Sequence, residues 1–207
     1  VGGTSDAIGP DGKFQFQTGW GTDKYALSTT GKSWSPLGFL YGAGGGRSGL
    51  FNKPAYQKNV PGAYRAVPDV GLDADPTTGM LIGETQTFPA GVQYGEFRLG
   101  GTSLASPLFA GMTALSLQHA GGTGAGLLNP TIYANAHSGA FTDVKGPSPV
   151  AGAVRADFAN GVDAAAGLLY SVRTFNQDSS LHVTRGWDDV TGVGSPNPKW
   201  LSAIPKG

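Results

Sequence analysis

A run of apolar residues between two glycine pairs is the feature that most constrains how this chain can fold. Residues 103–119 have helix-like apolar spacing, and glycine pairs at 100–101 and 121–122 bound them. We therefore expect residues 103–119 to form the longest helix of the protein, and we expect that helix to be buried. Ser103 opens it, where a small hydroxyl has no packing value. This serine is therefore either a helix cap or a nucleophile.

The charge pattern limits the classes of partner that the chain can bind. Charged residues make up only 14% of the sequence, against about 25% in an average soluble domain, and 35 of the 207 residues are glycine. The 14 basic and 14 acidic residues cancel, and neither sign forms a run. No apolar stretch approaches the ~20 residues that span a bilayer, and there is no cysteine. We expect a compact, secreted protein with no nucleic-acid and no membrane partner.

Other segments predict a mixture of strands and helices. Residues 13–20 alternate polar and aromatic side chains as a hairpin does, and strands are expected at 80–88 and near 167–175. Residues 129–136 should form a shorter helix, because asparagine and proline open this segment in the arrangement typical of a helix N-terminus. A short helix should close the chain at 195–204. Strands that alternate with buried helices indicate the α/β class.

The string GTSLASP around Ser103, followed by an apolar helix, resembles the nucleophile motif of the subtilisin-like peptidases. Further strings stand in the order and approximate spacing of one family of that clan, the sedolisin family of serine-carboxyl peptidases. They are VGGTS, GGGRS, PAYQ, VPDVGLDADPTTG, LGGTSLASPLFAG, LLNPTIY, FTDV and GWDDVTGVGSPN. The resemblance implies a subtilisin-like three-layer α/β fold with a mostly parallel central sheet. It also implies that Ser103 is the catalytic nucleophile in the hydrolysis of peptides or proteins.

FTDV and TRGWDD resemble the two halves of the family's calcium site. The resemblance implies carboxylate ligands from Asp143 and Asp188, and backbone carbonyl ligands from Val144, Thr184 and Gly186. Thr184 stands where the family usually has glycine, but a carbonyl ligand does not depend on its side chain. Such oxygen donors, completed by water, are what a calcium ion prefers. Without the resemblance, the two aspartates would be ordinary surface residues.

The chain lacks the carboxylate pair that the resemblance requires as a catalytic base. The family uses a glutamate paired with an aspartate one helical turn later, and another aspartate helps to hold the oxyanion. The only glutamates here are Glu84 and Glu96, and the residues four positions after them are Phe88 and Gly100. In the family these elements precede the VGGT strand, with which this chain begins. We therefore expect residues 1–207 to be the C-terminal portion of one catalytic domain.

That expectation has consequences for partners and conditions. An N-terminal segment of the same domain would supply the glutamate and both aspartates, and a propeptide would precede maturation. A carboxylate base suits a secreted peptidase active in acid, because an imidazole would already be protonated there. One alternative is an inactive, calcium-stabilised binding or structural module. Another is a fragment of a subtilisin-type peptidase, although His119, His137 and His182 all follow the serine.

A carboxylate group at residues 69–75 has two interpretations. Asp69, Asp73 and Asp75 stand close together in a segment punctuated by prolines. A second metal site is one interpretation. Turn-capping side chains are the favoured one, because short acidic side chains bond to the backbone of the turns in which they stand.

Overall fold

A glycine-rich strand lies in the middle of the small central sheet of this protein. The computed structural model describes residues 1–122, 124–146, 151–160, 164–177 and 180–205. Strand β1 (Gly2–Ile8) pairs antiparallel with β2 (Phe14–Gly19) and parallel with β7 (Gly71–Asp73). A Cβ atom on Gly3 would lie 2.6 Å from the Trp20 ring. Glycine at this position therefore lets a large core side chain pack directly on the strand backbone.

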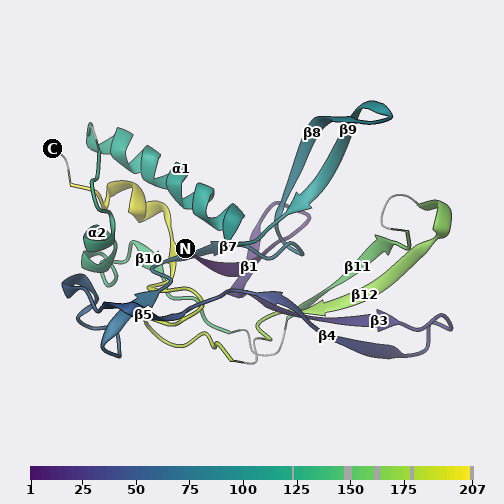
Figure 1. Cartoon of the computed structure of the whole chain (residues 1–207), viewed down its shortest axis with the longest axis horizontal. Helices are drawn as coiled ribbons and strands as arrows, with labels where there is room; N and C mark the ends of the chain where they lie inside the picture. Colours follow the sequence, from purple (N-terminus) through teal and green to yellow (C-terminus); the bar gives the residue numbers. More distant parts are fainter. Residues whose placement is uncertain (123, 147–150, 161–163, 178–179, 206–207) are drawn as a thin grey trace.

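The remaining strands form hairpins and a second sheet. Strands β11 (Gly152–Phe158), β12 (Leu168–Thr174), β3 (Gly21–Leu27) and β4 (Trp34–Gly42) make a four-stranded antiparallel sheet in that order. The three other pairs, all antiparallel, are β5 (Gly46–Asn52) with β6 (Tyr64–Val67), β8 (Met80–Phe88) with β9 (Gly91–Leu99), and β10 (Phe141–Thr142) with β13 (Ser195–Pro196). The β8–β9 hairpin and the four-stranded sheet project to the same side as two arms (Figure 1).

Two α-helices and three 3-10 turns complete the described fold. They are α1 (Thr102–Ala120), α2 (Asn129–Ala134), η1 (Ala55–Gln57), η2 (Ala164–Ala166) and η3 (Pro198–Ser202). Helix α1 packs on β7 and η3, where Trp200 is fully buried with ring centroids 5.4 Å from Phe109 and 5.1 Å from Phe141. Among the described residues, no helix is both long enough and apolar enough to cross a bilayer.

Only one face of α1 is covered by described residues. Ala105, Phe109, Ser116 and Ala120 are buried, whereas the opposite face is exposed. Its exposed residues are Ser103, Ser106, Pro107, Ala110, Gly111, Ala114, Leu115 and Gln118. No charged residue occurs between positions 102 and 118, and a helix without a charged face is typical of a fully buried position. The expectation of a long helix is confirmed, but the described residues bury this helix on one side only.

The predicted mixture of strands and helices is confirmed, but a mostly parallel central sheet is not found among the described residues. Strand pairing there is antiparallel except between β1 and β7. The physical reason is the length of the connections. Short turns such as residues 28–33 and 89–90 join neighbouring strands, and a parallel pair needs a long crossover. The expected three-layer arrangement is likewise not seen in the described part of the chain.

Replacing Trp200 with alanine should lower the free energy of unfolding by about 3–5 kcal/mol, because the cavity would lie between α1 and η3. Leu201→Ala is the matched control, since Leu201 is the next residue in η3 but is 37% exposed. It should cost less than about 1 kcal/mol. Urea unfolding followed by circular dichroism measures both. Equal losses in the two variants would contradict the assignment of Trp200 as the contact that holds α1.

Candidate active site

The backbone leading into α1 is held against the turn that follows β7. Gly101 has a φ of 83°, a region that favours glycine, and its N–H donates to the Ala74 carbonyl at 2.5 Å. A Cβ atom on Gly100 would lie 2.6 Å from both the Ala74 carbonyl oxygen and the Pro76 nitrogen. Two glycines are therefore needed here, because any side chain at position 100 would push the helix start away from residues 74–76.

Ser103 lies in the first turn of α1 with its side chain exposed. Its hydroxyl forms no hydrogen bond with a described residue, so it does not cap the helix. The first backbone amides of a helix have no intrahelical acceptor, and together with the macrodipole they favour negative charge at this end. A hydroxyl that becomes alkoxide-like, or an oxyanion beside it, would be stabilised there.

Neither glutamate contacts Ser103. Both stand on the exposed β8–β9 hairpin, where Glu84 accepts a hydrogen bond from Gln86 and Glu96 accepts one from the Tyr94 hydroxyl at 3.0 Å. The described residues therefore bring no carboxylate into hydrogen-bonding contact with the serine.

A fully buried carboxylate fixes the turn against which α1 starts. Asp75 accepts hydrogen bonds from the Ser5 hydroxyl at 2.9 Å, the Thr22 hydroxyl at 2.5 Å and the Thr77 amide at 2.7 Å. The bond to Thr77 is a turn cap, so the capping interpretation is confirmed for Asp75. The other two bonds come from β1 and β3. One side chain therefore connects both sheets to the segment that carries the serine.

The Thr78 hydroxyl links the Asp6 backbone to the Asp73 carboxyl group beside Asp75. The Asp6 amide donates to the Thr78 hydroxyl at 3.1 Å, and that hydroxyl donates to Asp73 at 2.8 Å. The pKa of the Asp73 carboxyl is raised to about 7, mainly by burial and also by the charges of Asp6 and Asp75, while the hydrogen bond from Thr78 opposes the rise. Burial also raises the pKa of Asp6. This cluster therefore favours protonated carboxyl groups.

Three of the sequence motifs meet in one hydrogen-bonded network. The Asp69 carboxylate pairs with Arg65 at 2.5 Å, and it accepts hydrogen bonds from Asn129 at 2.9 Å and from Tyr133 at 2.8 Å. The fully buried Gln57 donates to the Tyr133 hydroxyl at 2.6 Å and bonds to the backbone of Ala66. Burial raises the pKa of Tyr133. Asp69 is thus a cross-link between η1, β6 and α2, where the sequence predicted a turn cap.

The segments expected to bind calcium lie side by side. The Gly186 amide donates to Asp143 at 3.1 Å, and the Thr184 amide donates to the nearly buried Asp188 at 3.2 Å. Asp188 also accepts hydrogen bonds from the Val190 and Thr191 amides. No group of three or more His, Cys, Asp or Glu residues suited to a metal occurs in the described part of the chain.

The donor types in these segments fit a hard cation. The predicted set comprises two carboxylates and the backbone carbonyls of Val144, Thr184 and Gly186, and no described residue donates a hydrogen bond to these carbonyls. Oxygen donors of this kind are what calcium prefers. Of the residues predicted to bind calcium, Asp143 contacts Gly186 and Asp188 contacts Thr184 through hydrogen bonds from the backbone amides.

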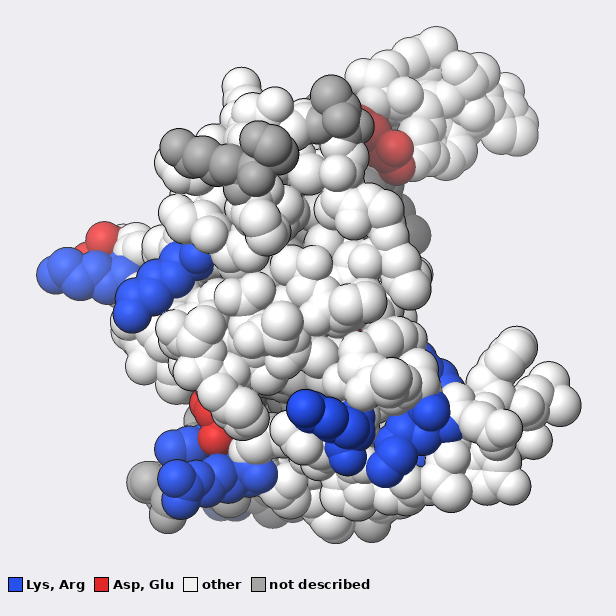
Figure 2. Space-filling view, turned by 90° about the vertical axis from the view of Figure 1, so that its left-hand side faces the viewer, with Lys and Arg blue, Asp and Glu red and all other residues white. Residues whose placement is uncertain are grey.

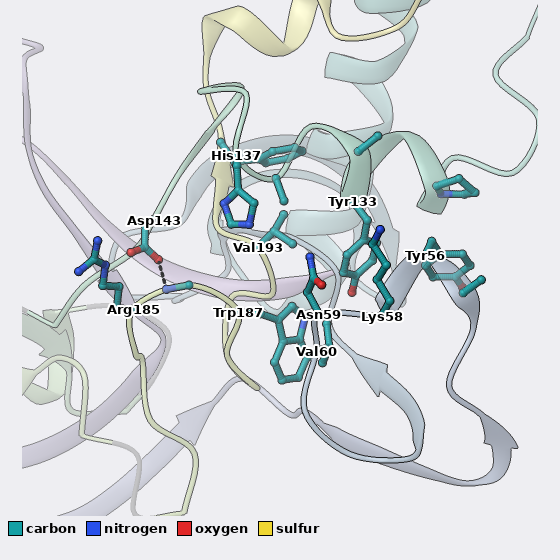
Figure 3. Close-up of a pocket in the computed structure, with 16 residues that line it drawn as sticks. Tyr56, Lys58, Asn59, Val60, Tyr133, His137, Asp143, Arg185, Trp187 and Val193 are labelled. Carbon is teal, nitrogen blue, oxygen red and sulfur yellow. Dashed lines mark hydrogen bonds between the residues drawn. The ribbon is translucent and has the colours of Figure 1, made fainter.

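A cavity of about 670 Å³ adjoins Asp143. Its lining includes Tyr133, Trp187 and Val193, together with Lys58 next to Tyr133 and Arg185 next to Asp143 (Figure 3). Lys and Arg side chains gather mainly in the lower half of the face that carries α2 and β5, where few acidic side chains are visible (Figure 2).

The indole N–H of Trp187 donates to the Pro68 carbonyl at 3.2 Å, and Arg47 lies 4.5 Å above its ring. Through these contacts, Trp187 packs the 184–188 loop against Pro68 and Arg47.

Comparison with known proteins assigns the chain to a family of peptidases. Sedolisin from Pseudomonas sp. is 32% identical over 206 residues, which cover 98% of this chain and 28% of that protein. Kumamolisin from Bacillus sp. is 33% identical over 166 residues, covering 74% of this chain and 23% of that protein. Tripeptidyl-peptidase sed4 from Aspergillus fumigatus is 28% identical over 190 residues, covering 80% and 29%. The chain belongs to the sedolisin family.

The chain spans between 23% and 29% of the length of these three relatives. No family model matches the chain, and no solved structure matches it. The family assignment therefore depends on sequence similarity along nearly the whole chain and on the motif order.

The raised pKa of Asp73 predicts that stability falls between about pH 4 and about pH 7. The folded pKa exceeds the unfolded value, so the contribution is fully present below the unfolded pKa and is lost as the pH rises through the folded one. Asp73→Asn mimics the neutral carboxyl group. At about pH 7 it should raise the free energy of unfolding by roughly 1–2 kcal/mol after allowance for solvent screening.

Denaturant unfolding at both pH values measures this difference. Asp11→Asn is the control, because the exposed Asp11 has a lowered pKa that results from its bonds to Lys13. Asp11→Asn should change the free energy of unfolding only slightly at either pH. A wild type and an Asp73→Asn variant with the same pH dependence would contradict the role given to Asp73.

Proposed function

We propose that this chain is part of a serine-carboxyl peptidase in which Ser103 is the nucleophile. The observation that carries the proposal is that the Ser103 hydroxyl is exposed at the start of α1 and bonds to no described residue, while the Gly101 amide ties the start of this helix to Ala74. The Ser103 oxygen bonds to the scissile carbonyl carbon while its proton passes to a base. The base returns this proton to the amine as the C–N bond breaks, and water then hydrolyses the acyl-enzyme. The substrates are peptides or proteins.

The base comes from an N-terminal segment of the same catalytic domain, and residues 1–207 form the C-terminal portion of that domain. Two observations support this division. No carboxylate of a described residue bonds to Ser103, and one face of α1 is uncharged and exposed. The missing segment supplies the glutamate, its paired aspartate and the oxyanion aspartate. It covers α1 and adds the strands of a three-layer, mostly parallel sheet.

A carboxylate base implies activity in acid, because it remains ionised where an imidazole is protonated. The raised pKa values of Asp6 and Asp73 also support an acidic working pH, since the folded state favours the protonated form of both carboxyl groups. We extend the proposal to a secreted enzyme that is made with a propeptide and processes itself. The names of the relatives, which include tripeptidyl-peptidases, support peptide hydrolysis.

A calcium ion would be held by the carboxylates of Asp143 and Asp188 and the carbonyls of Val144, Thr184 and Gly186. The hydrogen bond from Gly186 to Asp143 supports this set, because it joins the two segments, and the bond from Thr184 to Asp188 closes the 184–188 loop on itself. The ion would neutralise the two carboxylates and stabilise the 184–188 loop.

Ser103→Ala should abolish peptide cleavage, with a loss in kcat of roughly 10⁴-fold or more. Ser106→Ala is the matched control, because Ser106 is also exposed and lies one turn further along α1. The assay is release of peptides from denatured casein in acid, with the N-terminal segment present. Cleavage that survives in Ser103→Ala, or that is lost equally in Ser106→Ala, would refute the proposal.

Calcium removal should lower the melting temperature by several degrees, because the ion binds the folded state alone. Asp143→Asn should show the same loss and should no longer respond to chelator. Asp189→Asn is the control, since Asp189 pairs with Arg47 and lies outside the donor set. Differential scanning calorimetry with and without chelator decides the point. An unchanged melting curve in excess chelator would rule calcium out.

A further inference from the structure

A second cavity lies between the two projecting arms. It measures about 380 Å³ and is lined by Thr77, by Arg98 of β9 and by residues 153–156 of β11. Its walls thus come from the β8–β9 hairpin on one side and the four-stranded sheet on the other (Figure 1). Two arginines stand in this lining and no acidic residue does.

The face of the four-stranded sheet beside this cavity carries more positive than negative charge. The Asp157 carboxylate pairs with Arg155 at 2.6 Å, with Arg173 at 3.2 Å and with Lys24 at 3.8 Å. Lys24 and Arg173 are also direct cross-strand partners in β3 and β12, and like charges in such positions repel each other. One carboxylate cannot neutralise three cations, so a second anion would be electrostatically favourable on this face.

Arg98 and Arg173 add to the excess of positive charge around this cavity. Arg98 donates to the Thr77 carbonyl at 2.7 Å and forms no ion pair with a described residue. The side chain of Arg173 is 9% exposed, and its Nε–H bonds to no described residue. Arginine stays charged at every relevant pH. A buried guanidinium that shares its carboxylate partner with two other cations is costly, so Arg173 adds to the excess of positive charge on this face.

We infer that the cavity between β9 and β11 binds a carboxylate of the peptide substrate, with Arg98 and Arg155 as its direct ligands. The planar guanidinium matches a carboxylate in two parallel hydrogen bonds, a geometry that lysine does not provide. The carboxylate comes from an acidic side chain or from the C-terminus of the peptide. The choice of a peptide as ligand rests on the proposed function, whereas the anion site itself rests on the charges alone.

The cavity is close enough to the serine for one peptide to reach both. Arg98 and Ser103 are five residues apart, so their Cα atoms are separated by at most about 18 Å. An extended peptide of about the same number of residues spans that distance. A carboxylate bound at Arg98 would therefore belong to a residue only a few positions from the scissile bond, and the cavity would contribute to substrate specificity.

Binding of uncleaved peptides to the full chain carrying Ser103→Ala tests the inference. The probes are three fluorescent alanine-rich peptides. One contains a central glutamate and an amidated C-terminus, the second has glutamine in place of glutamate, and the third has glutamine and a free C-terminal carboxylate. Fluorescence anisotropy at about pH 6, where the carboxylates are ionised, gives each Kd. At least one carboxylate peptide should bind about tenfold or more tightly than the neutral one, and added salt should reduce that preference.

Arg98→Gln and Arg155→Gln should each weaken binding of the carboxylate peptide by about tenfold and leave binding of the neutral peptide unchanged. A purely structural role would weaken both peptides alike. Lys199→Gln, in η3 and remote from the cavity lining, removes the same charge and should change neither Kd. Equal binding of all three peptides, or unchanged binding in both arginine variants, would overturn the inference.

The outcome is separable from that of the proposed function. Loss of cleavage in Ser103→Ala with no carboxylate preference would leave the nucleophile standing and remove the anion site. A carboxylate preference that depends on Arg98 and Arg155, found together with full cleavage by Ser103→Ala, would retain the site and remove the proposed nucleophile.

Discussion

The position of the candidate nucleophile depends on the hydrogen bonds of one buried carboxylate. Asp75 binds Ser5 of β1, Thr22 of β3 and the amide of Thr77. The preceding residue, Ala74, accepts the hydrogen bond from Gly101 that starts α1. Removing the carboxylate would leave three polar groups without their acceptor in the core, where such groups are costly. The two sheets and the long helix would then lose their common contact.

Local patterns predicted the elements well and their long-range partners poorly. The helix at 102–120 and the strand at 80–88 follow from apolar spacing and glycine boundaries, which are properties of the neighbouring sequence. The bonds of Asp75 to Ser5 and Thr22 bridge 70 and 53 positions, and no local pattern encodes them. The mostly parallel sheet was inferred by resemblance, whereas short turns give these strands antiparallel neighbours.

In the candidate sites, too, residues within a motif could be predicted, whereas contacts between motifs could not. Ser103 and the donor set of Asp143 and Asp188 could be named from motifs, because the motifs carry both residue types and order. The network around Gln57 and Tyr133 was missed, although each residue stands in a recognised motif, because its partners lie in different motifs. The excess of positive charge beside Asp157 was also missed. A net charge of zero over 207 residues says nothing about how charges group on one sheet face.

The join between β9 and α1 determines which parts of this chain can vary in length. Each residue added to a helix rotates the following side chains by about 100°, so one extra residue between Gly100 and Ser103 would turn the hydroxyl to another side of α1. The tip of the β8–β9 hairpin has no such constraint, because both of its strands end at the same turn. Natural variation in length should therefore concentrate at residues 89–90 and avoid the glycine pair.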